Sequence, residues 1–194
     1  MIKTFMCLIV VFAVWTGCTK TDPVQRRVAM KAASAKAENM QVTASQSLYR
    51  VLPAVNFALN KVVDIKDLST ADSAEVWQWD WLNYPSQKWK AEKISGSFYR
   101  LINSLSGKAL TARNNIAGNT LVQATYSGNP GQYWKLGTSA QAGYYTLLNQ
   151  NGLAMALQSN SGSNGTAFIA DSKSNAATQR FVVQRIFNNP LRSS

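Results

Sequence analysis

The sequence is organised by a short triplet that occurs three times at nearly constant spacing. Gln87-Lys88-Trp89 recurs as Gln132-Tyr133-Trp134 and then as Gln179-Arg180-Phe181, so successive copies lie 45 and 47 residues apart. A fixed period of this length is typical of a fold assembled from repeated supersecondary units. One such unit is too small to bury its own apolar side chains, so the three copies must share one core.

Three further landmarks precede the triplet in the same order in every copy. They are an aromatic-rich segment (48–52, 98–102 and 144–148), an apolar segment after a turn (60–65, 107–112 and 152–157) and a second apolar segment (75–77, 120–122 and 167–169). Clusters of Gly, Asn and Ser separate them, which favours about four short strands per repeat. A propeller needs about four or more blades. We therefore predict an all-β fold, a β-trefoil of three ~45-residue repeats spanning about 47–95, 96–140 and 141–187, with a C-terminal tail at 188–194.

The triplets and their surroundings resemble a known family. Gln-x-Trp closes each of three repeats, and Tyr99-Arg100-Leu101-Ile102-Asn103 followed by Ser106–Leu110 precedes the second copy. This pattern resembles the ricin-B-type β-trefoil lectin family over roughly residues 47–187. The resemblance implies a domain of a kind that binds carbohydrate, often as a module of toxins and glycoside hydrolases, although some members have lost sugar binding.

Comparison among the repeats separates core rings from candidate binding rings. Positions that are apolar in all three copies are predicted to be core, and Trp77 is predicted to be core or half-buried. Trp79 and Trp81 are predicted to face solvent and to be binding candidates, because their positions hold a charged residue in the third repeat. The aligned sets are Trp89, Trp134 and Phe181; Val76, Leu121 and Phe168; Trp77, Val122 and Ile169; Trp79, Ala124 and Asp171; Trp81, Tyr126 and Lys173.

One carboxylate singles out the first repeat. Asp64 stands where the other copies have Thr111 and Ala156, and the resemblance implies that an Asp here is the main acceptor of sugar hydroxyls. A carboxylate accepts from two adjacent hydroxyls, an aromatic ring packs on the apolar face of a pyranose, and amides both donate and accept. The predicted sugar-binding residues are Asp64, Trp79, Trp81, Asn83, Gln87 and Gln78. Two alternatives stay open: Asp64 capping backbone N–H groups, and Gln87 bonding the backbone or Asp64 instead of a ligand.

A weaker second site is predicted at Gln123, Tyr126 and Asn129, where Thr111 replaces the carboxylate. The third repeat, with Ala156, is expected to have no site of this type. The residues directly before the triplets depart from the Asn or Asp usual in the family; they are Ser86, Gly131 and Thr178.

The N-terminal residues predict export and lipidation. Phe5–Trp15 is an unbroken apolar run of eleven residues after Lys3, shorter than the ~20 needed to span a bilayer and suited to a signal peptide. Trp15-Thr16-Gly17-Cys18 resembles a bacterial lipobox, with Trp15 in place of the usual Leu. This implies removal of residues 1–17, lipidation of Cys18 and anchoring in the bacterial cell envelope, at the outer membrane or cell surface; plain secretion is the alternative. Residues 18–46 have few large apolar side chains and are predicted to be a flexible tether.

Composition restricts the function classes. The 194 residues include no histidine, and both cysteines, Cys7 and Cys18, precede the repeats. The commonest general base and zinc ligand are therefore missing, and there is no Gly-x-Ser-x-Gly element. We expect no catalytic residues, metal or cofactor, although composition leaves open a carboxylate pair among the acidic residues of 64–80. The net charge of +11 is scattered, so no nucleic acid is expected. The predicted partner is a glycan or glycoconjugate, and contact with a membrane is expected through the lipid anchor only. The alternative is a sugar-independent protein-interaction trefoil using Trp79 and Trp81.

Overall fold

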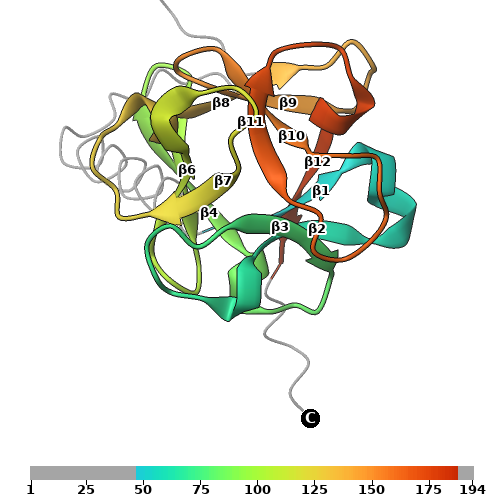
Figure 1. Ribbon diagram of the computed structural model, residues 1–194, viewed down its shortest axis with the longest axis horizontal. Helices are drawn as coiled ribbons and strands as arrows, with labels where there is room; N and C mark the ends of the chain where they lie inside the picture. Colours follow the sequence, from blue (N-terminus) through green and yellow to red (C-terminus); the bar gives the residue numbers. More distant parts are fainter. Residues whose placement is uncertain (1–46, 188–194) are drawn as a thin grey trace, which may run out of the picture. The chain divides into compact units, whose positions relative to one another are not determined.

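The computed structural model describes residues 47–187, which contain twelve strands in three sets of four (Figure 1). The first set is β1 (Leu48–Pro53), β2 (Lys61–Ile65), β3 (Val76–Asp80) and β4 (Trp89–Ser95); the second is β5 (Phe98–Asn103), β6 (Ala109–Ala112), β7 (Leu121–Ala124) and β8 (Trp134–Thr138); the third is β9 (Tyr145–Asn149), β10 (Leu153–Leu157), β11 (Phe168–Ser172) and β12 (Phe181–Ile186). The all-β, three-repeat prediction is confirmed. The predicted signal peptide, Cys18, the tether and the tail at 188–194 lie outside the described residues.

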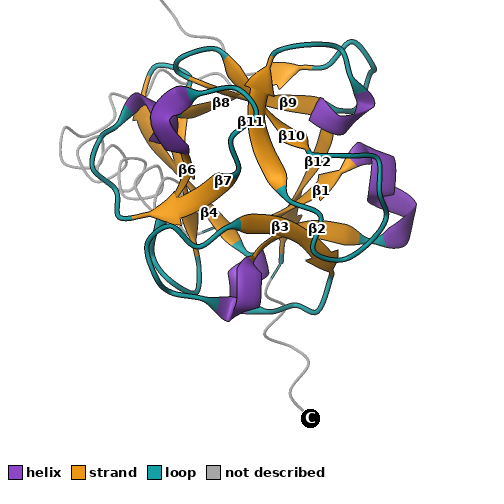
Figure 2. Ribbon diagram, in the orientation of Figure 1, coloured by secondary structure: helices purple, strands orange, loops and turns teal. Residues whose placement is uncertain are grey.

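Short 3-10 helices occupy the connections between these strands, as Figure 2 shows. They are η1 (Ala54–Leu59), η2 (Lys66–Leu68), η3 (Pro85–Gln87), η4 (Arg113–Asn115), η5 (Pro130–Gln132) and η6 (Ala177–Gln179). Three of them, η3, η5 and η6, end on the glutamine of a Gln-x-aromatic triplet, so each triplet marks the entry to the fourth strand of its repeat.

The first and fourth strands of every repeat form a closed antiparallel barrel. Its ring of pairs runs β1–β4, β4–β5, β5–β8, β8–β9, β9–β12 and β12–β1. A closed ring leaves no strand edge unpaired. Because the ring is closed by the pairing of β1 with β12, we expect residues 47–187 to fold on their own.

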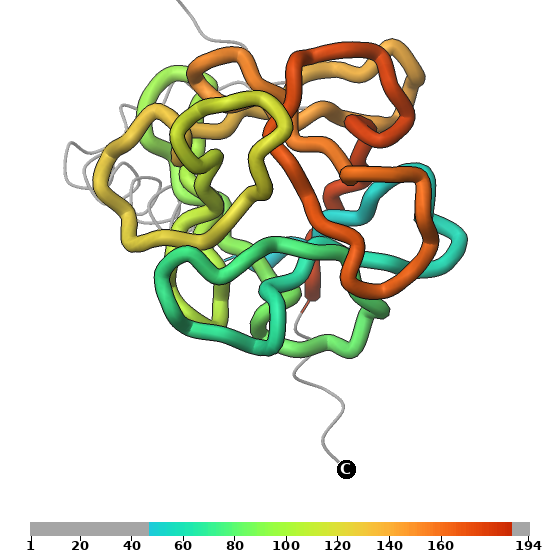
Figure 3. The backbone as a smooth tube through the Cα atoms, in the orientation of Figure 1, coloured from blue at the N-terminus to red at the C-terminus, as the bar shows by residue number. Residues whose placement is uncertain are grey.

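The second and third strands of every repeat form hairpins that cover one end of the barrel. The hairpins are β2–β3, β6–β7 and β10–β11. Figure 1 looks onto the triangle made by β3, β7 and β11, and Figure 3 traces the three hairpins around it. Single bridges join the hairpins in a cycle, and they pair Glu75 with Val122, Thr120 with Ile169, and Trp77 with Ala167.

The core is built from threefold-equivalent side chains. Trp89, Trp134 and Phe181 are buried, which confirms their predicted core role, and so are Val76, Leu121 and Phe168. The two indoles also bond the backbone of the second strand of their own repeat. Trp89 Nε1 donates to Val63 O at 3.2 Å, and Trp134 Nε1 donates to Leu110 O at 3.0 Å. Phe181 fills the same place without a donor.

The repeated glutamine ties two backbone segments together. Gln87 Nε2 donates to Asp80 O at 2.7 Å, and Leu82 N donates to Gln87 Oε1 at 2.8 Å. The same two bonds, to residues seven and five positions earlier, recur in the other repeats; they join Gln132 to Thr125 O and Ser127 N, and Gln179 to Ser172 O and Ser174 N. All three glutamines are buried. The repeated Gln is therefore a structural clamp, which explains why it recurs even where no sugar site is expected.

Candidate functional site

Asp64 lies in the middle of β2, directly opposite Trp77 of β3. Directly opposed residues of an antiparallel pair project from the same face, so the carboxylate and the indole share the outer face of this hairpin. The Asp64 residue is only 4% exposed. Its Oδ2 accepts a hydrogen bond from Gln87 Nε2 at 3.2 Å, which is one of the two roles left open for Gln87. Among the described residues, Oδ1 has no hydrogen-bond partner.

Asp64 is surrounded by other polar groups that are themselves without partners. Trp77 Nε1 and Ser86 Oγ are buried and also lack a hydrogen-bond partner within residues 47–187. Burial raises the pKa of Asp64, while polar contacts with Ser86, Gln87, the Ile65 backbone and Trp77 lower it. The Ser86 and Trp77 groups thus lie close to the carboxyl but do not meet the geometry of a hydrogen bond. Buried polar atoms are usually hydrogen-bonded. One unpartnered carboxyl oxygen with two unpartnered donors beside it marks a place that can accept the polar groups of a ligand or water.

An aromatic stack lies beside this cluster. The rings of Trp77 and Trp79 are stacked, with centroids 4.7 Å apart and an interplanar angle of 26°. Both residues are half-buried, as predicted for Trp77. Trp79 was predicted to face solvent, but it is only partly exposed, because Trp77 covers part of its ring. Trp79 lies opposite Val62, two pairs along from Asp64 and therefore on the same face of the hairpin.

Trp81 lies beyond the end of β3 and has a different neighbour. The Arg50 guanidinium lies over its ring, 5.0 Å from the centroid, so Trp81 is also half-buried rather than solvent-facing. The second repeat contains the equivalent pair, with Arg100 over Tyr126 at 4.4 Å. Trp79 and Trp81 therefore each have a covering partner and do not present two free rings side by side.

The two glutamines proposed beside the sites have a different role. Gln78 lies opposite Val63, so it projects from the face of the hairpin opposite Asp64, and the structure does not bring the two together. Its amide holds a loop of the third repeat, and Gln123 holds the equivalent loop of the first repeat. Gln78 Nε2 donates to Ser161 O and Ser163 O, and Gln123 Nε2 donates to Ser69 O and Ala71 O, at 2.7–3.0 Å.

The remaining predicted residues lie in the loops before the triplets. Asn83 is exposed and has a left-handed backbone conformation, with φ of 61°. Asn129 caps η5, since its side-chain oxygen accepts from Gly131 N at 2.8 Å. In the second repeat the Thr111 hydroxyl takes the place of the Asp64 carboxyl; it accepts from Gln132 Nε2 at 3.2 Å and donates to Ala109 O at 2.9 Å. It is fully satisfied, unlike the carboxylate.

A polar network beside the aromatic stack was not identified from the sequence. Lys61 Nζ lies 2.7 Å from both Asp80 Oδ1 and Asn164 Oδ1, and Asn164 Nδ2 donates to Asp80 Oδ2 at 2.8 Å. Lys61, and after it Asn164, lowers the pKa of Asp80. The sequence signal for this network is the lysine at the equivalent position of the second repeat, Lys108. In the structure Lys108 pairs with Asp72 at 2.7 Å.

Metal and membrane features are limited within the described part of the chain. No three His, Cys, Asp or Glu side chains gather there in a way that could hold a metal ion. No helix within residues 47–187 has the length and apolar character required to cross a bilayer.

The family profile described as "Ricin-type beta-trefoil lectin domain-like" matches residues 40–125 and 97–171. The chain belongs to this family. A search of curated sequences finds no match. Among solved structures, this lectin-like chain is similar to the designed threefold-symmetric protein ThreeFoil, with 29% identity, a TM-score of 0.65, and coverage of 70% of this chain and 96% of that one.

Two natural proteins show the same fold at lower identity. The exo-β-1,3-galactanase of Clostridium thermocellum is 24% identical with a TM-score of 0.67, and the match covers 73% of this chain but 30% of the enzyme. The C-half of an earthworm R-type lectin, solved in complex with GalNAc, is 14% identical with a TM-score of 0.59; the match covers 72% of this chain and 99% of that one. The fold is thus that of carbohydrate-binding lectins, and it also occurs within an enzyme.

Proposed function

We propose that this chain is a non-catalytic carbohydrate-binding protein whose main sugar site lies in the first repeat, around Asp64. The observation that carries the proposal is the unpartnered Oδ1 of a buried carboxylate. The same fold builds this position with Thr111 and with Ala156 in the other repeats, so it needs no carboxylate there. An unpartnered buried acceptor costs free energy, and a local cost that the fold does not require is typical of a functional site.

The proposed roles follow from the chemistry of the groups. Ionised Asp64 accepts hydrogen bonds from sugar hydroxyls, which are stronger than bonds between neutral groups. The Trp77–Trp79 stack offers an indole surface to the apolar face of the sugar ring, and the exposed amide of Asn83 both donates and accepts. Because Trp77 lies directly opposite Asp64, we expect this indole to move when a ligand reaches Oδ1.

The proposed setting is a bacterial envelope glycan bound by a tethered lectin. Lipidation of Cys18 would display many copies on one surface, so that weak individual sites act together through avidity. The GalNAc complex of the earthworm lectin supports the ligand class without specifying the sugar. Replacement of Cys18 by Ala is expected to abolish the incorporation of labelled fatty acid into the full-length protein in the producing cells. Unchanged incorporation in the variant would contradict the anchor.

A glycan array followed by calorimetric titration of the best ligand tests the sugar site. The samples are the Gln41–Ser194 fragment and its Asp64→Thr and Trp79→Ala variants. The matched control is Asp171→Ala, which removes a carboxylate at the position equivalent to Trp79 in the third repeat. We expect both site variants to lose at least tenfold in affinity, about 1.4 kcal/mol, and the control to bind like wild type.

The possible results distinguish a wrong site assignment from a wrong function. Equal binding by wild type and Asp64→Thr would contradict the site in the first repeat but would leave carbohydrate binding by this protein intact. A wild-type fragment that binds no glycan would overturn carbohydrate binding itself. The sugar-independent alternative predicts a protein partner that Trp79→Ala releases and that free sugars do not displace.

A further inference from the structure

The barrel end opposite the hairpins is hollow. A cavity of about 430 Å³ lies there between the barrel strands, with Trp89 and Trp134 among its walls. A cavity of this size is sufficient for a small ligand, because binding pockets typically measure about 300–1,000 Å³. Its walls are almost entirely apolar, with Val51, Leu101 and Val183 among them. Apolar walls do not suit the hydroxyls of a sugar, so this cavity is distinct from the proposed lectin site.

The end of the barrel around this cavity has threefold character, and two of its three equivalent tyrosines, Tyr49 and Tyr99, line the cavity. Tyr49, Tyr99 and Tyr145 stand at equivalent places on β1, β5 and β9, each paired across the ladder with the outer end of a fourth strand. Those partners are Arg185, Lys93 and Thr138. We call the rim formed by Tyr49, Lys93, Tyr99, Tyr145 and Arg185 the barrel mouth.

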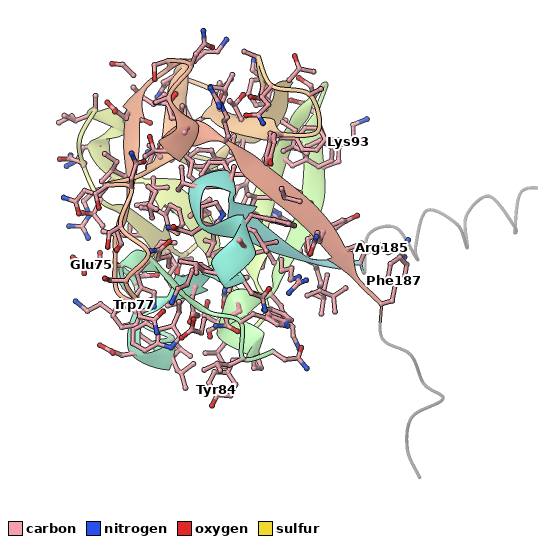
Figure 4. All side chains as sticks on the ribbon, turned by 90° about the vertical axis from the view of Figure 1, so that its right-hand side faces the viewer. Glu75, Trp77, Tyr84, Lys93, Arg185 and Phe187 are labelled. Atoms are coloured by element: carbon pink, nitrogen blue, oxygen red, sulfur yellow. The ribbon has the colours of Figure 1, made fainter. Side chains whose placement is uncertain are left out.

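The barrel mouth combines aromatic, apolar and basic groups. Leu136, which lines the cavity, is 51% exposed, and Phe187, just past β12, is 77% exposed. Lys93 and Arg185 are exposed, and neither belongs to any of the five ion pairs found within residues 47–187. Figure 4 shows Lys93, Arg185 and Phe187 on one side of the molecule, and Glu75 and Trp77 on the opposite side. Tyrosines, exposed apolar groups and unpaired basic groups together are typical of surfaces at the membrane interface.

We propose that the barrel mouth docks on a membrane surface that contains anionic lipid, with one acyl chain entering the cavity between the tyrosines. The basic pair attracts the anionic head groups, and the aromatic rim lies at head-group level. The course of the chain fits this orientation. Leu48 pairs with Ile186 at the outer end of the ladder, so the segment before residue 47 begins at this rim. The hairpin end, with Asp64 and Trp77, then points away from the membrane.

Brominated lipids test the proposal, because bromine quenches only the indoles that the acyl chain approaches. In the Gln41–Ser194 fragment, replacing Trp77, Trp79 and Trp81 by Phe leaves Trp89 and Trp134, both lining the cavity, as the only tryptophans. The probes are vesicles of phosphatidylcholine alone and of phosphatidylcholine with one quarter phosphatidylglycerol, each with brominated and with ordinary acyl chains. We expect sedimentation with the anionic vesicles, and quenching by their brominated chains.

Matched variants separate docking from general attraction to a basic protein. Lys93→Gln and Arg185→Gln should each weaken vesicle partitioning about fivefold, whereas the control Lys173→Gln, an exposed lysine beyond β11, should leave it unchanged. Leu136→Asp should abolish quenching, and Ile116→Asp, a residue 55% exposed in a hairpin connection, should not. Circular dichroism establishes that each variant is folded.

Three results would overturn the proposal. They are the absence of vesicle binding, vesicle binding without quenching of Trp89 and Trp134, and equal effects of the site and control variants. Membrane docking would also be overturned if the protein did not bind vesicles but a soluble brominated fatty acid quenched its tryptophans. The cavity would then bind a free amphiphile.

Discussion

Replacing Asp64 by Thr should stabilise the protein at neutral pH, although it removes a buried side chain from a strand. The variant copies the second repeat, where Thr111 bonds the clamp glutamine at 3.2 Å, the same distance as the bond that Asp64 makes to Gln87. That bond is therefore replaced rather than lost. What disappears is the unpartnered Oδ1, and an unsatisfied buried acceptor costs about 1–3 kcal/mol. The expected gain in unfolding free energy is of this size, and the melting temperature rises by about 2–4 °C per kcal/mol for a domain of this length.

The pH dependence of this gain has a definite sign. Burial raises the pKa of Asp64 in the folded state above its ordinary value of 3.8, so the folded state holds this proton at pH values where the unfolded state has released it. The stability of the wild type therefore falls as the pH rises through this window, and then levels off. The advantage of Asp64→Thr should be smallest near pH 3.8 and largest at neutral pH.

Urea denaturation of the Gln41–Ser194 fragment, followed by tryptophan fluorescence at a series of pH values, measures both effects. Asp171→Ala is the control for a change of net charge. If Asp64→Thr were about 1 kcal/mol or more less stable than wild type at pH 7, Asp64 would be a structural residue. The argument that assigns it to a ligand would then fail.

Two other predictions concern the clamp glutamine of the second repeat and the ion pair of Asp80. Gln132→Ala removes the bonds to Thr125 O and Ser127 N and leaves a cavity, so the unfolding free energy measured by urea titration should fall by about 2–4 kcal/mol. The control Gln141→Ala, at an exposed glutamine, should change the unfolding free energy by less than about 0.5 kcal/mol. Equal effects of the two variants would refute the structural role of Gln132. Lys61 and Asn164 lower the pKa of Asp80, so its ion pair stabilises the fold above the ordinary carboxyl pKa, and this contribution is lost as the pH falls through the lowered value. Asp80→Asn should flatten the acid limb of the stability profile, and an unchanged limb would contradict this.

The repeats made the fold and much of the core predictable from sequence. Trp89, Trp134 and Phe181 could be placed together because a position that is apolar in three copies has the same buried environment in each. The fold and core depend on short-range periodicity and on equivalence among copies, both of which are visible in the chain. The ring beside Asp64 was not predicted in this way, because the sequence pointed to Trp79 and Trp81, whereas the hairpin register puts Trp77 directly opposite Asp64.

The partners of individual polar and aromatic side chains were not predictable in this way. Gln78 resembled a candidate ligand residue, but its acceptors are backbone carbonyls of a loop more than eighty residues later. Trp81 looked free because Arg50, which covers it, lies on another strand. The Gln78 contacts depend on which loop of the third repeat packs against the first, whereas the Trp81 contact depends on how β1 lies beside the end of β3 within the first repeat. The spacing of residues along the chain predicts neither arrangement.

The internal threefold comparison supports the two proposals in opposite ways. At the hairpin end the informative feature is a difference among the repeats. Asp64 differs from its equivalents Thr111 and Ala156, and it leaves a buried oxygen unpartnered. At the barrel mouth the informative feature is the agreement, because all three repeats place a tyrosine at this end of the barrel, and two of them, Tyr49 and Tyr99, line a cavity that these rings do not fill. A core requirement explains neither, since core positions are both alike and fully packed. A ligand at each end explains both, and the two ends can be tested separately because no described residue belongs to both sites.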